Sequence, residues 1–315
     1  MAIMITGGTG FIGAHLAHRL LDMGETVVLF DASPDRQAVH DMSERVTLVR
    51  GDVTALQDVL HAVKAHGVDR IVHLAYILGP ENEQNPPRAI QINCMGTNNV
   101  FEVARLERLR RVVWASSVAV YGPRSFYGKE SLDEYDPPNP TRVYGACKLL
   151  NEHLAEHYFQ QFNVEHMALR PSVVYGPGRL RGSAQFMQAW LEDAALGGKV
   201  YIPSGAEQDT WSYIEDVAEA FLLAVRAEVL PPHRIFNIGG DFRSRRELGD
   251  YLRALLPDAQ VEIGSEAIAG GYRSARHLNR RLTDALGFRV QWGLERGVKA
   301  TLNWARRRAG LPPVD

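Results

Sequence analysis

The sequence predicts an α/β fold in which a doubly wound parallel sheet is followed by a smaller C-terminal α/β lobe. Three observations lead to this prediction. Short apolar, β-branched runs alternate with longer segments of helical periodicity, which is the pattern of stacked βαβ units. A glycine-rich turn, TGGTGFIG, follows the first run directly. The 315 residues are 45% hydrophobic and 23% charged, values typical of a globular protein with a large core.

The predicted strands are continuous apolar runs, as expected for parallel strands that helices cover on both faces. We place them at 2–6, 26–30, 46–49, 70–74, 111–115 and 165–170. Between them, apolar residues recur at helical spacing; in one such segment Leu56, Val59, Leu60 and Val63 fall on one face. The predicted helices span 11–23, 55–66, 88–108 and 143–162.

The last third of the chain has a different pattern: its predicted helices and strands are shorter, and Pro-rich and Gly-rich connections separate them. We therefore predict a sheet-based domain at 1–170 and a mainly substrate-binding lobe at 171–315, with segments after 205 returning to the first domain. One helix start in the lobe is well marked: Ser244 followed by Glu247 and an apolar periodic run forms a capping-box pattern.

Charge and cysteine usage restrict the partners. Lys and Arg number 35 against 37 Asp and Glu, so the formal charge of −2 gives no electrostatic reason to expect nucleic acid or an anionic membrane. A small-molecule ligand is favoured instead. Cys94 and Cys147 are far apart in the sequence and lack metal-ligand spacing, so neither a disulfide framework nor a metal site is predicted. With no charged leader and no run of 18 apolar residues, we expect a cytoplasmic protein.

The glycine turn predicts a dinucleotide site of the Rossmann type. Gly7, Gly10 and Gly13 between a strand and a helix permit a tight turn, close approach to a pyrophosphate, and packing of the helix on the sheet. Asp31, at the end of the second strand, can accept hydrogen bonds from an adenosine ribose and would repel a 2′-phosphate. NAD is therefore favoured over NADP, although Arg36 nearby is placed to accommodate that phosphate.

Two residues after the third strand have two interpretations. Asp52 and Val53 are placed to cover the adenine, and Asp52 can also cap the helix that begins near Ala55.

A second group of residues predicts acid/base chemistry. Tyr144 and Lys148 are four residues apart on a predicted helix, so their side chains lie on one face. A neighbouring ammonium favours the phenolate and makes tyrosine usable as a general acid/base on an alcohol or carbonyl. Ser116 and Ser117 end the fifth strand, where hydroxyls face the ligand crevice of an open α/β sheet; they could equally stabilise a turn.

The ordered set of motifs resembles the extended short-chain dehydrogenase/reductase family, the NAD-dependent epimerase/dehydratase group, over nearly the whole chain. The motifs are TGGTGFIG, Asp31, GDV at 51–53, HLA at 73–75, INCMGTNNV, SSVAVYG, YGACK and RPSVVYGPG. The resemblance implies that Tyr144 is the acid/base, that Lys148 supports it and binds the nicotinamide ribose, and that Ser117 hydrogen-bonds the substrate oxygen, with Ser116 as the fallback.

The same resemblance implies further contacts and an assembly. Asn93 would help to shape the site, and Phe11 and Ile12 would offer backbone N–H groups to the pyrophosphate. Ala75 would lie along the cofactor, and Pro171 to Val174 beside the nicotinamide. The helices at 88–108 and 143–162 would pair across a twofold axis to form a homodimer.

The reaction is left between two hypotheses. Dehydratases of the family carry an Asp-Glu pair where this chain has Val118 and Ala119, which disfavours dehydration. Nucleotide-sugar epimerases usually have an asparagine where Val173 stands and an arginine for the diphosphate where Asp209 aligns. An anionic Asp209 near a diphosphate would be unfavourable by about 1 kcal/mol or more if partly buried. Arg179, Arg181 or Arg273 could supply the missing cation.

The first hypothesis is an NAD-dependent dehydrogenase that transfers a hydride between a secondary alcohol of a small hydroxy compound and NAD. The missing diphosphate ligands favour it, as does LGPENEQNP at 78–86, which is similar to threonine dehydrogenases of the short-chain type. The alternative is an NAD-dependent sugar or nucleotide-sugar epimerase, favoured by SSVAVYG and RPSVVYGPG. A non-catalytic dinucleotide sensor is disfavoured because the serine, tyrosine and lysine are all present.

Overall fold

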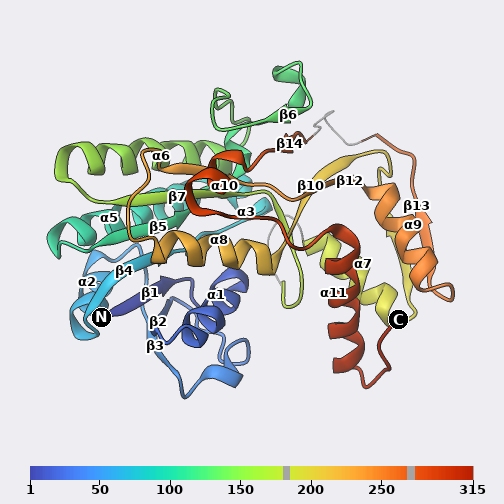
Figure 1. Ribbon diagram of the computed structural model, residues 1–315, viewed down its shortest axis with the longest axis horizontal. Coiled ribbons are helices and arrows are strands. Elements are labelled where there is room, and N and C mark those ends of the chain that lie inside the picture. The colour runs from blue at the N-terminus through green and yellow to red at the C-terminus, as the bar shows by residue number, and fades with distance from the viewer. Residues whose placement is uncertain (180–184, 268–273, 315) are drawn as a thin grey trace.

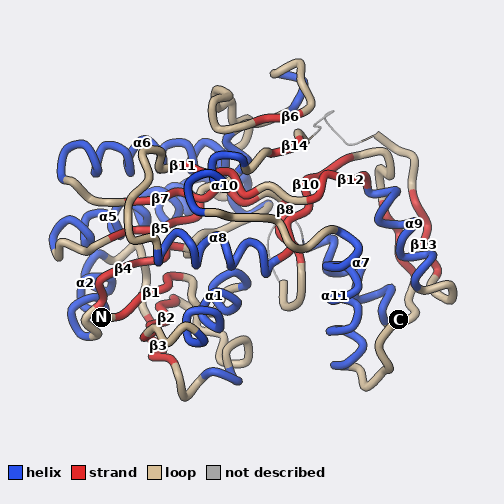
Figure 2. Tube along the Cα trace, viewed as in Figure 1, coloured by secondary structure: helices blue, strands red, loops and turns tan. Residues whose placement is uncertain are grey.

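The computed structural model describes residues 1–179, 185–267 and 274–314, and it confirms the predicted fold class (Figures 1 and 2). Its centre is a seven-stranded sheet in the order β11-β7-β5-β4-β1-β2-β3. All of its strand pairs are parallel. The strands are β1 (Ala2–Thr6), β2 (Thr26–Asp31), β3 (Val46–Arg50), β4 (Val68–His73), β5 (Arg111–Ala115), β7 (His166–Pro171) and β11 (Ile235–Ile238).

Helices cover both faces of this sheet. One face is contacted by α1 (Phe11–Asp22) and α8 (Ile214–Arg226), which also pack against each other. The opposite face is covered by three helices that contact one another in turn: α2 (Leu56–Ala65), α5 (Gly96–Leu106) and α6 (Val143–Phe162). Burial on both faces explains why the strands read as continuous apolar runs rather than as alternating ones.

The helix predicted at 88–108 is confirmed as one continuous helical segment that ends at Leu106, and it contains a turn that periodicity did not predict. The chain runs from α4 (Pro86–Ala89) through a π-helical turn at Ile90–Met95 into α5 (Gly96–Leu106), and the residues at both junctions keep helical backbone angles. Asn93 lies in the π turn, and its carbonyl accepts hydrogen bonds from Asn151 Nδ2 and Thr97 Oγ1, both at 2.7 Å. Asn151 belongs to α6, so the backbone of this turn is held partly by a tertiary contact, which helical periodicity does not reveal.

The C-terminal lobe is built from small sheets and helices beside the large sheet (Figure 1). Its strands pair as β8 (Val173–Tyr175), β10 (Gln208–Tyr213) and β12 (Asp241–Ser244), as β9 (Lys199–Ile202) with β13 (Gln260–Ile263), and as β6 (Ser131–Leu132) with β14 (Arg276–His277). The helices are α7 (Gln185–Ala195), α9 (Arg245–Leu255), α10 (Arg280–Leu286) and α11 (Leu294–Arg308), while α3 (Pro80–Gln84) lies near α6. The capping box of Ser244 and Glu247 at the start of α9 is confirmed.

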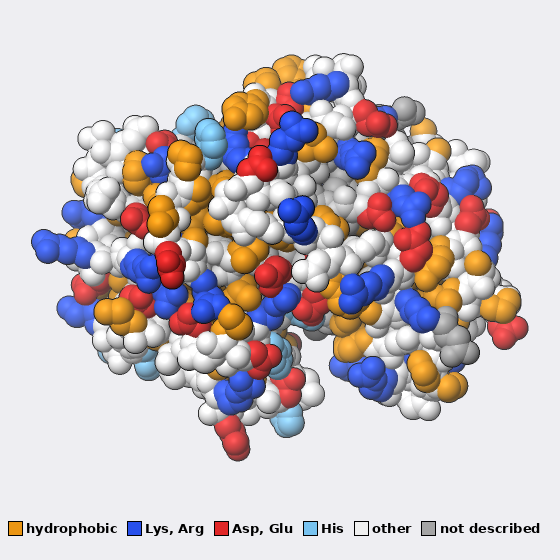
Figure 3. Space-filling model, viewed as in Figure 1, with side chains coloured by type: hydrophobic (Ala, Val, Ile, Leu, Met, Phe, Trp, Pro, Cys, Tyr) orange, Lys and Arg blue, Asp and Glu red, His pale blue; other side chains and the backbone are white. Residues whose placement is uncertain are grey.

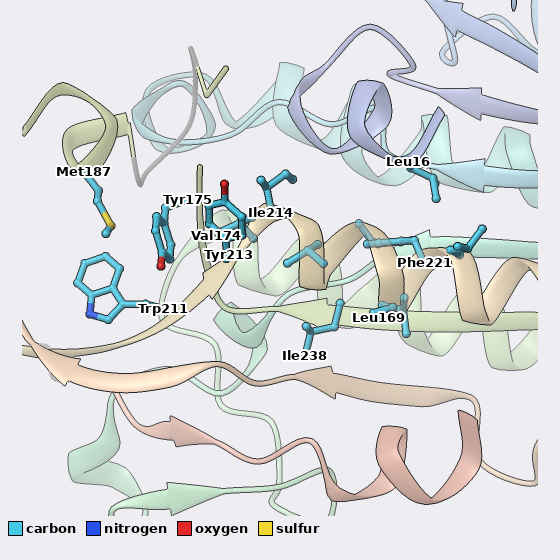
Figure 4. Close-up of a cluster of buried hydrophobic side chains, with 14 of the residues drawn as sticks. Leu16, Leu169, Val174, Tyr175, Met187, Trp211, Tyr213, Ile214, Phe221 and Ile238 are labelled. Carbon is cyan, nitrogen blue, oxygen red and sulfur yellow. The ribbon is translucent and has the colours of Figure 1, made fainter. Parts of the chain in front are cut away.

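One continuous apolar core joins the sheet to the lobe. Figure 4 shows Leu169 of β7, Ile238 of β11 and Phe221 of α8 at one end of this core. Tyr175 of β8 and Trp211 of β10 lie at the other end, and every one of these side chains is buried. The lobe is therefore packed onto the sheet rather than joined to it by a linker alone. This packing fixes the position of the lobe relative to the sheet. Within the described ranges, no helix combines the length and apolar character needed to cross a bilayer.

A buried ion pair docks α6 on the sheet. Glu152 of α6 and Arg170 of β7 are each 4% exposed, and the guanidinium donates to both carboxylate oxygens at 2.7 and 2.6 Å. Ser116, just after β5, donates to the same carboxylate at 2.5 Å, and Arg170 also donates to the Tyr121 hydroxyl at 2.6 Å. Such a pair is costly to break, because removing one partner leaves the other charge buried.

We expect Arg170→Met to lower the free energy of unfolding by about 3 kcal/mol, because it strands the Glu152 carboxylate. Urea unfolding followed by circular dichroism measures this loss. The Glu152→Leu/Arg170→Met double variant should recover part of it, since neither charge then remains buried. A single variant as stable as the parent would contradict the prediction.

Candidate active site

The cleft between the large sheet and the lobe holds most of the residues that the sequence singles out. It has a volume of about 1380 Å³, ample for a dinucleotide, and Figure 3 shows it as the deep notch at the lower edge of the molecule. Its walls come from the glycine turn, from the segments that follow β2, β3, β4, β5 and β7, and from α7 and α11. Carboxyl ends of parallel strands meet at one edge of a sheet, which is where open α/β sheets bind ligands.

The glycine turn brings the N-terminus of α1 to this cleft. Gly7 has a φ of +66°, a conformation that side chains disfavour. A Cβ on Gly13 would lie 2.6 Å from the Gly7 carbonyl oxygen and 2.8 Å from that of Gly8, so only glycine permits this packing. Gly10 precedes the helix without a side-chain cap, and Phe11 and Ile12 line the cleft. The uncapped N–H groups and the positive end of the helix dipole suit a pyrophosphate.

Acidic residues line the same part of the cleft. Asp31 Oδ2 accepts from Thr9 Oγ1 at 2.8 Å and Oδ1 accepts from Ser33 N at 3.0 Å, which orients the carboxylate. Asp52 and Val53 also line the cleft. The interpretation of Asp52 as a helix cap is wrong: α2 has no side-chain cap, and Asp52 Oδ1 accepts from Thr54 N at 2.8 Å. Asp52 thus closes a local turn before the helix.

Three further predicted cofactor contacts lie along the cleft. Ala75 follows β4, and its N–H donates to Thr6 Oγ1 at 3.4 Å. Pro171 ends β7 and Val174 lies in β8, and both are buried at the cleft wall. These positions come from different strands that meet at one edge of the sheet.

Lys148 is completely buried beneath the cleft. Its ammonium donates to the Ala115 carbonyl at 2.5 Å and lies 5.5 Å from the centre of the Tyr144 ring, as the four-residue spacing on α6 predicts. Burial holds the pKa of Lys148 well below its usual value. Tyr144 lines the cleft.

Two neighbours oppose the effect of burial on Tyr144. Burial raises the pKa of its phenol, whereas a hydrogen bond with the Ser117 side chain and the charge of Arg179 lower it. Ser117 Oγ also accepts from Ala119 N at 3.1 Å, which fixes the hydroxyl. The Ser116 hydroxyl is directed to Glu152 instead. The structure therefore brings Ser117, not Ser116, to the phenol.

Asn93 lies behind the cleft and holds the chain that follows β4. Its Oδ1 accepts from Ile77 N at 2.9 Å, and its Nδ2 donates to Asn82 Oδ1 at 2.7 Å. Asn82 in turn donates to the Ile77 carbonyl at 2.9 Å and is completely buried. This network fixes residues 77–82 beside the cleft, which agrees with a role for Asn93 in shaping the site.

The candidate cations differ in their position. Arg179 is only 9% exposed, lines the cleft, donates to the Val174 carbonyl at 2.8 Å, and lies 5.4 Å from the centre of the Phe11 ring. Arg181 and Arg273 lie outside the described residues. Asp209 is buried and accepts from Arg245 Nε at 3.2 Å, so its charge is neutralised within the lobe.

The sequence reasoning missed several residues of the site. Tyr76 covers the ammonium of Lys148, and Glu83 of α3 accepts from the first backbone N–H groups of α6. Asn82 and Glu152 carry buried hydrogen bonds. Only Tyr76 had a local signal, because it directly follows the HLA motif; the others act through contacts distant in sequence. Among residues 1–179, 185–267 and 274–314, no cluster of three or more His, Cys, Asp or Glu side chains could hold a metal.

Known proteins resemble the chain along its whole length. The UDP-glucose 4-epimerase of Mycolicibacterium smegmatis is 29% identical, with 98% of this chain and all of that protein covered. The crystal structure of the Thermus thermophilus UDP-glucose 4-epimerase in complex with NAD is 26% identical, with a TM-score of 0.84 over 97% of this chain and 99% of that one. The L-threonine dehydrogenase of Cupriavidus necator shares the fold at 23% identity, with a TM-score of 0.87 over 96% and 99%.

The family model matches as well. The model of the NAD dependent epimerase/dehydratase family aligns with residues 3–239, which include the glycine turn and the tyrosine-lysine pair. Because this match covers well over half of the sequence, the chain belongs to that family and is an NAD-dependent enzyme of the extended short-chain dehydrogenase/reductase type.

Proposed function

We propose that this enzyme is a sugar epimerase whose sugar is carried on a nucleotide. In this reaction a carbinol carbon is oxidised transiently and then reduced from the opposite face. The observation that carries the proposal is Arg179, a buried cation in the cleft with no carboxylate partner among the described residues.

Arg179 calls for an anionic ligand. Burial lowers the pKa of its guanidinium to about 10, so the group remains charged at neutral pH. Its printed hydrogen bond goes to a neutral carbonyl, and its Nε has no hydrogen-bond partner in the described structure. A buried charge without a counter-ion is unfavourable, and a phosphate or carboxylate of a bound ligand would compensate it. Its neighbours, Phe11 and Tyr144, put that anion between the glycine turn and the acid/base.

The ion pair between Asp209 and Arg245 bears on the epimerase hypothesis, because the sequence alone suggested a charge at position 209 that would repel a diphosphate. An unpaired Asp209 would repel a diphosphate, and this counted against the epimerase hypothesis. Because Arg245 neutralises the carboxylate within the lobe, the repulsion is largely cancelled. Relatives at 26–29% identity that carry the name UDP-glucose 4-epimerase add weight on the same side.

The residues of the cleft fit this chemistry. NAD, when bound, accepts the hydride from the carbinol carbon and later returns it. The glycine turn with Phe11 and Ile12 would hold the pyrophosphate, and Asp31 the adenosine ribose. Tyr144 would take the hydroxyl proton of the substrate while the Ser117 hydroxyl holds the same oxygen, and the Lys148 ammonium would stabilise the phenolate. Tyr144 then returns the proton to the oxygen when the carbon is reduced.

A dehydrogenase of a small hydroxy compound is the second candidate. The same pair of Asp209 and Arg245 favours it, because position 209 offers a neutralised carboxylate where nucleotide-sugar epimerases usually have an arginine for the diphosphate. A small hydroxy acid needs no such group, and its single carboxylate could pair with Arg179.

The two candidates differ in what accumulates. We expect the enzyme with NAD to invert one carbinol centre of a nucleotide sugar without net formation of NADH, because the hydride returns to the product. A panel of nucleotide sugars, free hydroxy acids and amino alcohols, followed by NMR and by NADH absorbance, tests this. Stoichiometric NADH with a free hydroxy compound, and no inversion of any nucleotide sugar, would identify the dehydrogenase instead.

The Tyr144→Phe variant serves as the control for this assay. It should lower turnover by about 10²-fold or more, since it removes the proton-transferring group, and should leave NAD affinity nearly unchanged. Turnover at the parent rate would remove Tyr144 from the acid/base role.

Cofactor preference gives a separate prediction. We expect Asp31→Ala to weaken NAD binding by about 10-fold or more, the value of a hydrogen bond to a charged group, and to weaken NADP binding far less. Calorimetric titration with both dinucleotides measures the change. The matched control is Arg36→Ala, which is exposed and not among the residues lining the cleft, and should leave NAD affinity unchanged. Equal losses of NAD and NADP in the Asp31 variant would contradict the assignment.

We also propose a homodimer that pairs the α5 and α6 helices of two copies. These helices lie side by side at one edge of the molecule (Figure 1). With the π turn they carry the exposed apolar side chains of Ile90, Met95, Leu106, Leu150 and Phe162. Burial of such side chains in a second copy would be favourable.

Light scattering after size exclusion should give twice the chain mass at micromolar concentration. Leu150→Lys should shift the protein toward the monomer, because it would bury a charge at the interface, whereas Leu311→Lys, at an exposed site near the C-terminus, should not. A parent protein that elutes as a monomer would count against the dimer.

A further inference from the structure

The ring of Tyr76 covers the buried ammonium of Lys148. Tyr76 follows β4 and lines the cleft, and the centre of its ring lies 2.7 Å from Lys148 Nζ. The Ala115 carbonyl accepts from the same ammonium at 2.5 Å. The ammonium is thus held by one carbonyl oxygen and one aromatic face, and its side chain has no exposure to solvent.

These two contacts compensate for lost hydration. Removing an ammonium from water is costly, and burial favours the neutral amine. The negative face of an aromatic ring attracts a cation, and the attraction grows when the pair is desolvated. A single carbonyl is a modest replacement for water, so the ring supplies a second interaction that favours the charged form.

Several titratable groups around Lys148 also act on its charge: Cys147, Cys94 and Glu152 raise the pKa of the lysine against the effect of burial. The titratable neighbours are His73 of β4, Cys94 of the π turn, and Tyr144, Cys147 and Glu152 of α6. The Glu152 carboxylate is already paired with Arg170. Burial holds the pKa of His73 well below its usual value, so that side chain is neutral near pH 7. The Tyr76 ring and the Ala115 carbonyl are the two groups in direct contact with the ammonium, and of these the ring is the one that a side-chain substitution can remove.

The position of Tyr76 is itself fixed. Its ring packs on the His73 ring with 4.7 Å between centres, and the next residue, Ile77, donates its N–H to Asn93 at 2.9 Å. The network of Asn93 thus reaches the acid/base pair through the chain that carries Tyr76.

We propose that Tyr76 is a positioning residue for the acid/base pair: its ring holds the Lys148 ammonium in place and charged beside Tyr144. Tyr76 acts through Lys148 and transfers no proton. The proposal rests on the proposed function for the role of Tyr144, and it predicts that the aromatic ring matters while the hydroxyl of Tyr76 does not.

The decisive comparison is between Tyr76→Phe and Tyr76→Leu. Both variants lack the phenol at position 76 and keep an apolar side chain, so the comparison removes the aromatic face; the smaller leucine also leaves space beside the ammonium. Each variant is taken through a pH titration with saturating NAD while phenolate absorbance is followed. The same titration is repeated with Tyr144→Phe added to each variant, and the difference between the two curves gives the signal of Tyr144. Without the ring, the lysine loses its proton at lower pH, and the Tyr144 phenol then loses its own at higher pH.

We expect the Tyr144 midpoint of Tyr76→Leu to lie about half to one pH unit above that of Tyr76→Phe. The apparent pKa on the acidic side of the pH profile of kcat/KM should rise in Tyr76→Leu in the same way. In Tyr76→Phe this apparent pKa should equal that of the parent enzyme. Tyr76→Met repeats the comparison with another aliphatic side chain should Tyr76→Leu fold poorly, with thermal unfolding as the check.

Coincident Tyr144 midpoints in the phenylalanine and aliphatic variants would overturn the proposal. The absorbance titration needs no substrate, so it decides the role of Tyr76 even if no substrate of the panel is turned over. Absence of turnover in the parent would count against the proposed function alone.

Discussion

The buried ion pair of Glu152 and Arg170 is the interaction on which the geometry of the site depends. Through it one carboxylate on α6 is joined to β7 and to the hydroxyl that ends β5. Lys148 lies one helical turn earlier on α6 and Tyr144 two turns earlier, so the ion pair sets where these two side chains lie relative to the cleft. A helix held by apolar contacts alone could slide along the sheet, whereas a bidentate ion pair fixes both its height and its rotation.

Around this docked helix, the site is assembled from chain segments that are distant in sequence. The π turn with Asn93 holds residues 77–82, Glu83 caps the first turn of α6, and Tyr76 covers Lys148. Tyr144 and Lys148 are thus held in position by a second layer of polar and aromatic contacts. That layer explains why the cleft can keep a lysine completely buried without a carboxylate of its own.

The cations and anions of the lobe bear on the reaction in opposite ways. The position of Asp209 in the sequence predicts a carboxylate that faces the ligand. In the structure this carboxylate forms an ion pair with Arg245 instead. Arg179 was one of three candidate cations in the sequence, and among the described residues it is buried at the cleft without a carboxylate partner. The charges that remain available to a ligand are therefore those that find no partner within the protein, and the pairing depends on packing between segments.

The sequence by itself determined the fold class, the nucleotide turn, the acidic residue after β2 and the tyrosine-lysine pair, because each depends on contacts within a few residues or on one strand-turn-helix unit. The tertiary structure decided the rest. It put a π turn inside the helix predicted at 88–108, moved Asp52 from helix cap to local turn, separated Ser116 from Ser117, and placed Tyr76 on Lys148. In each case the deciding contact is a hydrogen bond, charge or ring supplied by the surrounding fold, which local periodicity and spacing do not encode.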